Sequence, residues 1–168
     1  NLSTQIHTID SREYKVSYDY NKDQQITSIT YPSGLSVNYH YNQSGKIDAI
    51  TSNQHFVPIV SAIEQMPFGP IKSLVYGNQL KLIRDYDLNY RLTQQQVGEI
   101  EDQYTYDELG NITSITKKQL PQESKEYSYD LLNRISAMQS TSENQSFTYH
   151  SGDGAMREKT STIDGKIQ

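Results

Sequence analysis

Three acidic residues near the middle of the chain are the first candidates for chemistry. Glu99, Glu101 and Asp102 lie close together in the sequence, and a glycosidase needs two carboxylates flanking one glycosidic bond. The alternative is an exposed charged strand edge or loop, where the charges discourage association with another sheet. We favour the second interpretation. No candidate nucleophile has a base at a recognisable spacing, so the sequence predicts no catalytic residue and no enzyme.

Metal sites are the second candidate. Asp19, Asn21 and Asp23 resemble the start of an EF-hand loop, which also needs glycine at the sixth position and a bidentate glutamate at the twelfth. Gln24 and Thr30 occupy those places, which favours a solvated turn. The histidines, at positions 7, 40, 55 and 150, show no spacing typical of a metal site. We therefore expect no metal and no cofactor.

Charge and composition exclude further classes. The net charge is −5 and no cluster of Lys and Arg is present, so the phosphate contacts of a protein that binds nucleic acid are not expected. No apolar run approaches the length of a membrane span. The absence of cysteine excludes disulfides and thiolate metal sites. The 14 tyrosines compensate for few aliphatic residues, because each can bury its ring while its hydroxyl stays hydrogen-bonded.

The stretch from Tyr104 to Thr116 shows how these tyrosines are used. Tyr104 and Tyr106 alternate onto one face of an extended strand. Residues 107–111 have the composition of a turn, and residues 112–116 return as a β-branched strand. This unit is predicted to be a β-hairpin.

Copies of this hairpin recur along the chain. The place of its second tyrosine returns at intervals of 20 to 24 residues, which gives about seven repeats, with Gln65 in that place in a degenerate third copy. Such a period without helical spacing predicts a β-repeat architecture. We expect an all-β protein of repetitive antiparallel β-hairpins in a long curved or spiralling sheet, with residues 1–168 as a single repeat region and no second domain. The residues that define the repeat are Tyr18, Tyr20, Tyr39, Tyr41, Gly45, Gly69, Tyr86, Asp87, Tyr104, Tyr106, Asp107, Gly110, Tyr127, Tyr129, Asp130 and Tyr149.

Other segments are less regular. Residue types alternate within residues 1–15 well enough to suggest a strand, but they support no further assignment. Ile59–Gln65, between two prolines, is interpreted as extended rather than helical. Asp164 and Gly165 suggest a last hairpin turn. Lys117, Lys118 and Pro121 are of the types that protect exposed strand edges.

The pattern Tyr-x-Tyr-Asp-x-x-Gly-Asn/Arg-Ile/Leu at residues 104–112, with relatives at 127–135 and 86–92, resembles the YD repeat of Rhs proteins. That family includes the shell subunits of bacterial insecticidal toxin complexes and the extracellular region of teneurins. Residues 67–80 are similar to a variant found inside Rhs cores, and the resemblance covers about residues 14–160. It implies a sheet that spirals into a hollow shell. The Asp-Pro motif of the family's self-cleaving region does not occur here.

The resemblance implies a structural, encapsulating segment of a bacterial toxin or cell-surface protein, secreted or surface-associated. Its expected partners are the rest of its own shell and an enclosed toxin domain. A segment cut from a sheet exposes unpaired edges, so we also expect a homodimer of the isolated segment, above all through the region after Thr160. The alternative function is a carbohydrate-binding or adhesive module that uses exposed tyrosine faces.

Overall fold

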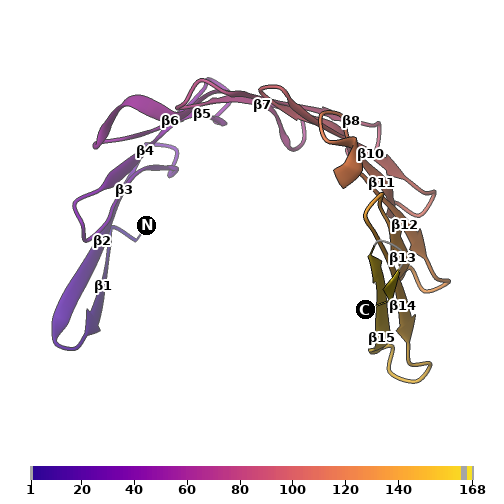
Figure 1. The fold of residues 1–168 in the computed structure, drawn as a ribbon. Helices are drawn as coiled ribbons and strands as arrows, with labels where there is room; N and C mark the ends of the chain where they lie inside the picture. Colours follow the sequence, from indigo (N-terminus) through magenta and orange to yellow (C-terminus); the bar gives the residue numbers. More distant parts are fainter. Residues whose placement is uncertain (1, 164–165, 168) are drawn as a thin grey trace. The chain divides into compact units, whose positions relative to one another are not determined.

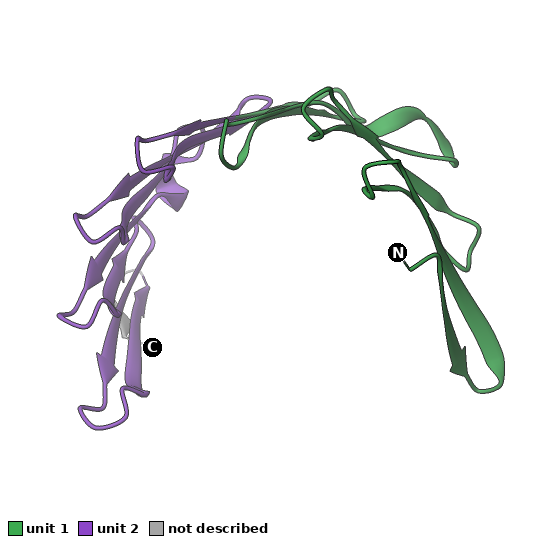
Figure 2. Cartoon of the chain, turned by 180° about the vertical axis from the view of Figure 1, so that it is seen from behind, with its two compact units in different colours: residues 1–83 green, residues 84–168 purple. Residues whose placement is uncertain are grey.

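The computed structural model describes residues 2–163 and 166–167, and this part of the chain consists of β-strands and one short 3-10 helix. The chain divides into two compact units, residues 1–83 and 84–168, which Figure 2 colours green and purple. In both units each strand pairs with the next strand along the chain. That the whole chain is one repeat region remains a prediction.

The first unit is a sheet of antiparallel neighbours in sequence order (Figure 1). Its strands are β1 (Thr4–Ile9), β2 (Arg12–Tyr20), β3 (Ile26–Thr30), β4 (Ser36–Tyr41), β5 (Ile47–Ser52), β6 (His55–Gln65) and β7 (Ile71–Tyr76), followed by β8 (Lys81–Tyr86), within which the boundary between the units falls.

The second unit repeats the arrangement, again with antiparallel neighbours. Its elements are β9 (Leu92–Val97), β10 (Ile100–Tyr106), β11 (Ile112–Lys117), the 3-10 helix η1 (Pro121–Glu123), β12 (Lys125–Tyr129), β13 (Ile135–Gln139), β14 (Glu143–Tyr149), β15 (Met156–Ile163) and β16 (Lys166–Ile167). The predicted all-β fold of antiparallel hairpins is confirmed.

A β-bulge marks the second tyrosine of the hairpins. The pairing register shifts directly before Tyr20, Tyr41, Tyr106, Tyr129 and Tyr149. A bulge bends its strand and increases the local twist. The same distortion is therefore introduced at the same place in successive repeats, just before the turn.

Few side chains are fully buried, because each unit is a single sheet layer. Among the described residues, four hydrophobic residues are buried: Ile63, Leu74, Leu82 and Met138. The repeat tyrosines are half-buried at best, so the expectation that their rings are buried is met only in part. Within residues 2–163 and 166–167 the strands form one sheet layer, and the rings lie along neighbouring strands of that layer.

Two of the less regular segments are ordered strands. Residues 4–9 and 12–20 pair as β1 and β2, and Ile59–Gln65 belongs to the extended strand β6, as expected. The suggested turn at Asp164 and Gly165 lies outside the described residues. Residues 166–167 nevertheless pair with Thr162 and Ile163.

Glu99 lies in an exposed turn, which is the loop alternative of the sequence analysis, but the prediction of an exposed strand edge is wrong for the lysines and for Glu101. β11 pairs with β10 and with β12, and Lys117 lies opposite Asp102, so the lysines do not protect an edge. β10 is likewise an interior strand, and Glu101 retains 8% of its accessible surface. Whether a strand lies at an edge depends on how the hairpins pair with one another. The positions of charged residues in the sequence do not predict this pairing.

Candidate functional site

The second tyrosine of the repeat joins its hairpin to the preceding segment of chain. The hydroxyls of Tyr41, Tyr106, Tyr129 and Tyr149 donate to main-chain oxygens 14 to 17 residues earlier, over 2.7 to 2.8 Å. The acceptors are Ile26, Leu92, Ile112 and Ile135, each the first residue of the strand after the previous turn. Tyr20 donates to the carbonyl of Leu2 in the same way. The tyrosine thus fixes one repeat against the next.

The residue after this tyrosine organises the turn. In the second unit, Asp107 Oδ1 accepts the main-chain N–H groups of Leu109 and Asn111, at 3.0 and 2.8 Å. Asp87 and Asp130 accept the equivalent pairs of N–H groups. A side-chain oxygen that binds the main chain two residues on is the usual reason for Asp or Asn in a turn. This geometry accounts for the Asp of the repeat.

In the first unit, asparagine has the same role. Asn21 Oδ1 accepts the N–H groups of Asp23 and Gln25, and Asn42 Oδ1 accepts those of Ser44 and Lys46. Of the EF-hand-like start, Asp19 therefore belongs to the end of β2, and Asn21 and Asp23 belong to the turn that follows it. Within the described residues, no group of three or more His, Asp or Glu side chains has the geometry to hold a metal ion.

The last residue of several turns reaches the turn or the second tyrosine of the following repeat, which the sequence analysis missed. Arg91 binds Asp87 at 2.6 Å, lies over the Tyr106 ring with 4.8 Å to the centroid, and donates to the carbonyl of Asp107. Arg134 likewise binds Asp130 and lies 4.2 Å from the centroid of Tyr149. The only sequence signal is a long polar side chain directly after the glycine position of the motif.

In the first unit, the corresponding side chains donate hydrogen bonds to main-chain carbonyls of the next turn. Gln25 Nε2 donates to the carbonyl of Gly45, and Lys46 Nζ donates to those of Met66 and Pro67. The degenerate third repeat therefore still receives the turn-to-turn bond, through its main chain. Gln65 pairs with Ile71 across this hairpin, as the second tyrosines pair in other repeats.

At two repeats, main-chain conformation favours the glycine of the motif, whereas Gly69 of the degenerate third copy is not in the left-handed region. Gly45 and Gly110 have φ angles of 70° and 89°, in the left-handed region. Gln24, Tyr90 and Asn133 occupy the same turn position with φ angles of 58° to 64°. These side chains accept a conformation that glycine adopts at lower cost.

The turn carboxylates are held ionised. The Asn111 amide, with main-chain N–H donors, lowers the pKa of Asp107. The guanidinium and main-chain N–H of Arg134 lower the pKa of Asp130. For Asp87, desolvation raises the pKa, but donors from Arg91 and Asn89 outweigh it and the pKa is lowered. Burial raises the pKa of Tyr106 and Tyr129, so their phenols remain donors.

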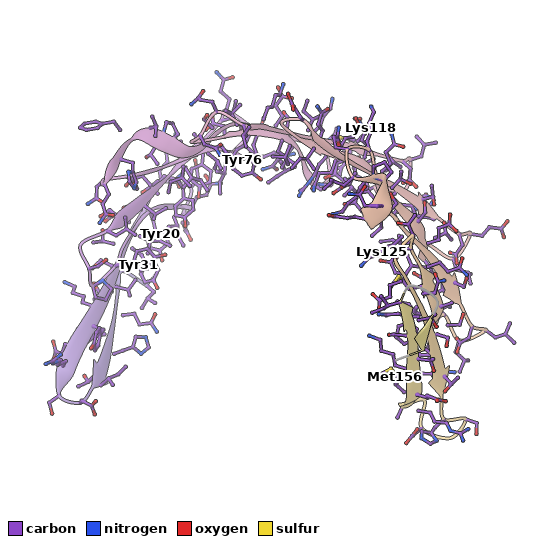
Figure 3. The ribbon with its side chains drawn as sticks, in the orientation of Figure 1. Tyr20, Tyr31, Tyr76, Lys118, Lys125 and Met156 are labelled. Atoms are coloured by element: carbon purple, nitrogen blue, oxygen red, sulfur yellow. The ribbon has the colours of Figure 1, made fainter. Side chains whose placement is uncertain are left out.

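Strand alternation gives each unit two different faces. The tyrosine face of the second unit carries Tyr104, Tyr106, Tyr127 and Tyr129 opposite aliphatic residues of the paired strands. The other face carries hydroxyls, amides and charges, such as Thr105, which hydrogen-bonds to Thr113 and Ser114. In Figure 3, Lys118 lies on the opposite side of the second unit from Lys125.

The first unit is divided in the same way. Tyr20 and Tyr31 lie on one side of it (Figure 3), and Tyr39 and Tyr41 pair with Ile50 and Ile47 on the same face. Thr30 and Ser36 hydrogen-bond to each other at 2.8 Å on the reverse face.

The acidic trio does not form a glycosidase site. Glu101 and Asp102 are consecutive in β10 and therefore project to opposite faces, and Glu99 lies in the turn before the strand. Glu101 binds Lys118 Nζ at 2.9 Å and accepts from Gln103. The Lys118 hydrogen bond is the main cause of the lowered pKa of Glu101. Glu101 and Asp102 therefore cannot flank one bond, and the carboxylate of Glu101 is bound by Lys118.

Solved structures of Tc toxins have the same fold. The Photorhabdus luminescens Tc holotoxin pore with a mutated TccC3 is 16% identical over 90% of this chain, with a TM-score of 0.79. The TcdB2-TccC3 complex and its TcdB2-TccC3-TEV form are each 15% identical over 91% and 96% of this chain, with TM-scores of 0.81 and 0.83. This chain spans about a tenth of the length of those chains.

These similarities confirm, at the level of the fold, the resemblance to Rhs and YD-repeat shells. No protein-family model matches the sequence, and no curated protein matches it. No helical segment within residues 2–163 and 166–167 has the length and apolar composition needed to cross a membrane.

Proposed function

We propose that the chain is a wall segment of a larger YD-repeat shell, with a structural, encapsulating and non-catalytic role. The single observation that carries the proposal is the bonding between repeats. Tyrosine hydroxyls reach back to the preceding return strand, and the last turn residues reach forward to the next turn. An isolated hairpin is marginally stable in water, whereas repeats that bind their neighbours can extend a sheet indefinitely.

The similarity to Tc toxin structures supports this role. The partners that we propose are the rest of the same shell and a toxin domain enclosed by it. We also propose a bacterial protein that is secreted or exposed at the cell surface. The polar atoms of the motif support the non-catalytic part of the proposal, because turn caps and repeat-to-repeat bonds account for them without a substrate.

Cryo-electron microscopy of the complete gene product tests the proposal. We expect residues 4–163 to form part of a continuous wall around a cavity. A gene product without further repeats, or a structure in which this segment is a free arm, would contradict the wall assignment. Assays for hydrolase and transferase turnover of the purified chain test the non-catalytic role, and turnover that a point mutation in the chain abolishes would refute it.

We further propose that the isolated chain associates through its sheet edges. Within the described residues, β16 pairs with β15 at Thr162 and Ile163 alone, which leaves Met156–Ser161 without a second neighbour strand. Unpaired strand edges promote pairing with another chain. Sedimentation over a hundredfold concentration range should reveal a dimer, and a monomer throughout would refute association without affecting the wall assignment.

A further inference from the structure

The connection between β11 and β12 departs from the regular repeat. It comprises residues 118–124 and contains η1, whereas the other connections on this side of the hairpins comprise two to five residues, such as 98–99 and 140–142. β11 and β12 pair only through Ser114 with Glu126 and Ile115 with Lys125. Insertions on a rigid scaffold are frequent places for binding sites.

A cleft lies beside this connection, within the second unit. Its volume is about 480 Å³, which is in the range of small-molecule sites. Ile115 and Tyr127 of the tyrosine face line the cleft, and so do the side chains of Lys117, Glu123, Lys125 and Glu143. The cleft thus combines an aromatic ring and an aliphatic side chain with several polar groups.

Three hydrogen-bonded contacts connect side chains around the cleft. Lys117 Nζ binds Glu123 Oε2 at 2.7 Å and so attaches η1 to β11. On the other side, Glu143 Oε1 accepts from Gln145 Nε2 at 2.6 Å, and the Ser140 hydroxyl accepts the Glu143 N–H. The walls are therefore formed without a ligand, which lowers the entropic cost of binding.

Two residues that line the cleft carry a polar group without a partner among the described residues. The Tyr129 hydroxyl donates to the carbonyl of Ile112, whereas the Tyr127 hydroxyl makes no hydrogen bond in the described structure, and the Lys125 ammonium has no ion pair there. Both groups are free to bind a ligand.

The charges of the lining determine the class of ligand. Lys117 and Lys125 balance Glu123 and Glu143, so the cleft offers donors and acceptors without net charge. Sugar hydroxyls both donate and accept, and the apolar face of a sugar ring packs against an aromatic side chain. We propose that this cleft binds a neutral saccharide, with the ring against Tyr127, Lys125 Nζ and the Tyr127 hydroxyl as donors, and Glu143 as an acceptor. This inference goes beyond the wall assignment and does not depend on it.

Titration of the 168-residue chain with free glucose, galactose, mannose and N-acetylglucosamine, followed by two-dimensional amide NMR, tests the proposal. We expect at least one sugar to shift resonances from residues 115–127 and 140–143. Tyr127→Phe and Lys125→Met should each weaken that binding about fivefold or more, the scale of one lost hydrogen bond. Tyr104→Phe is the matched control, because it removes the equivalent hydroxyl one repeat earlier, outside the cleft, and should leave binding unchanged.

The proposal is overturned if none of the sugars shifts these resonances at about 50 mM, or if Tyr104→Phe weakens binding as much as Tyr127→Phe. Tenfold tighter binding of glucuronate than of glucose would also overturn it, by showing a site for anions at Lys125. Lys125 is exposed, so Lys125→Met keeps the test decisive if Tyr127→Phe impairs folding.

Discussion

The two units use the same turn geometry with different chemistry. Asn21 and Asn42 cap turns of the first unit with neutral amides, whereas Asp87, Asp107 and Asp130 cap turns of the second unit with carboxylates. The geometry needs only an oxygen at the first turn position, so both residue types satisfy it. At Asp87 and Asp130 the charge adds a second function, because the carboxylate also binds the arginine that lies over the next tyrosine ring.

Removing a tyrosine ring should have the largest effect. Tyr41→Ala and Tyr106→Ala each lose a half-buried ring and a hydroxyl bond between repeats, and we expect destabilisation of about 2–3 kcal/mol, below the value for a fully buried aromatic. Tyr106 also lies under Arg91, so its loss should cost about 0.5–1 kcal/mol more than that of Tyr41.

Urea unfolding of the full chain measures this difference, with the exposed Leu109→Ala as a control that should change little. Equal losses for the two tyrosine variants would show that the arginine of the second unit adds nothing to the stability of the repeat.

The second largest expected difference between the two units is the loss of turn stability at low pH. The pKa values of Asp87, Asp107 and Asp130 are lowered in the folded chain, so their stabilising contribution is complete above the unfolded pKa of about 4. It is lost as the pH falls through the lower folded values. The Asn21 and Asn42 caps do not titrate, so their turns should keep their stability.

Amide hydrogen exchange, corrected for its intrinsic pH dependence, can follow Asn111 and Lys46 as reporters of the two kinds of turn. Protection of the Asn111 N–H should fall below about pH 4, while that of Lys46 persists. Asp107→Asn, which keeps an oxygen but removes the charge, should abolish the acid effect at that turn. If the Asn111 and Lys46 amides lost protection at the same pH, the proposed difference between Asp-capped and Asn-capped turns would be refuted.

Replacing glycine at the left-handed turn position, and introducing glycine there, should give smaller effects of opposite sign. Gly110→Ala places a side chain at a φ of 89° without a close contact, and the conformational cost is about 1 kcal/mol. Gln24→Gly, at a φ of 64° in the first unit, should stabilise by about 0.5 kcal/mol, because relief of strain exceeds the added chain entropy. Thermal unfolding measures both, and destabilisation by Gln24→Gly would contradict the argument.

Loss of a single hydroxyl should also have a small effect, similar in size to that of the glycine substitutions. Tyr41→Phe and Tyr129→Phe keep the ring and remove one hydrogen bond to the preceding repeat, so we expect losses of about 0.5–1.5 kcal/mol in either unit. Urea unfolding midpoints compare them directly. A change in one unit alone would show that the hydroxyl bond is not a general feature of the repeat.

The sequence by itself determined the hairpin and its turn. Alternating tyrosines, Asp or Asn at the first turn position and glycine at the left-handed position act within a few residues, so their physical effects can be recognised in the letters. The interpretation of Ile59–Gln65 as extended was confirmed for the same reason: the prolines on either side favour an extended segment over a helix.

Only the tertiary structure decided which side chains meet between repeats. The carbonyl that Tyr129 binds is 17 residues away, and Arg91 reaches a turn 16 residues further on. Glu101 was expected on an exposed strand edge or loop, but it is buried and binds Lys118, because neighbouring strands enclose β10 on both sides. Pairing between hairpins sets these contacts, and a local pattern of residue types carries no information about the partner strand.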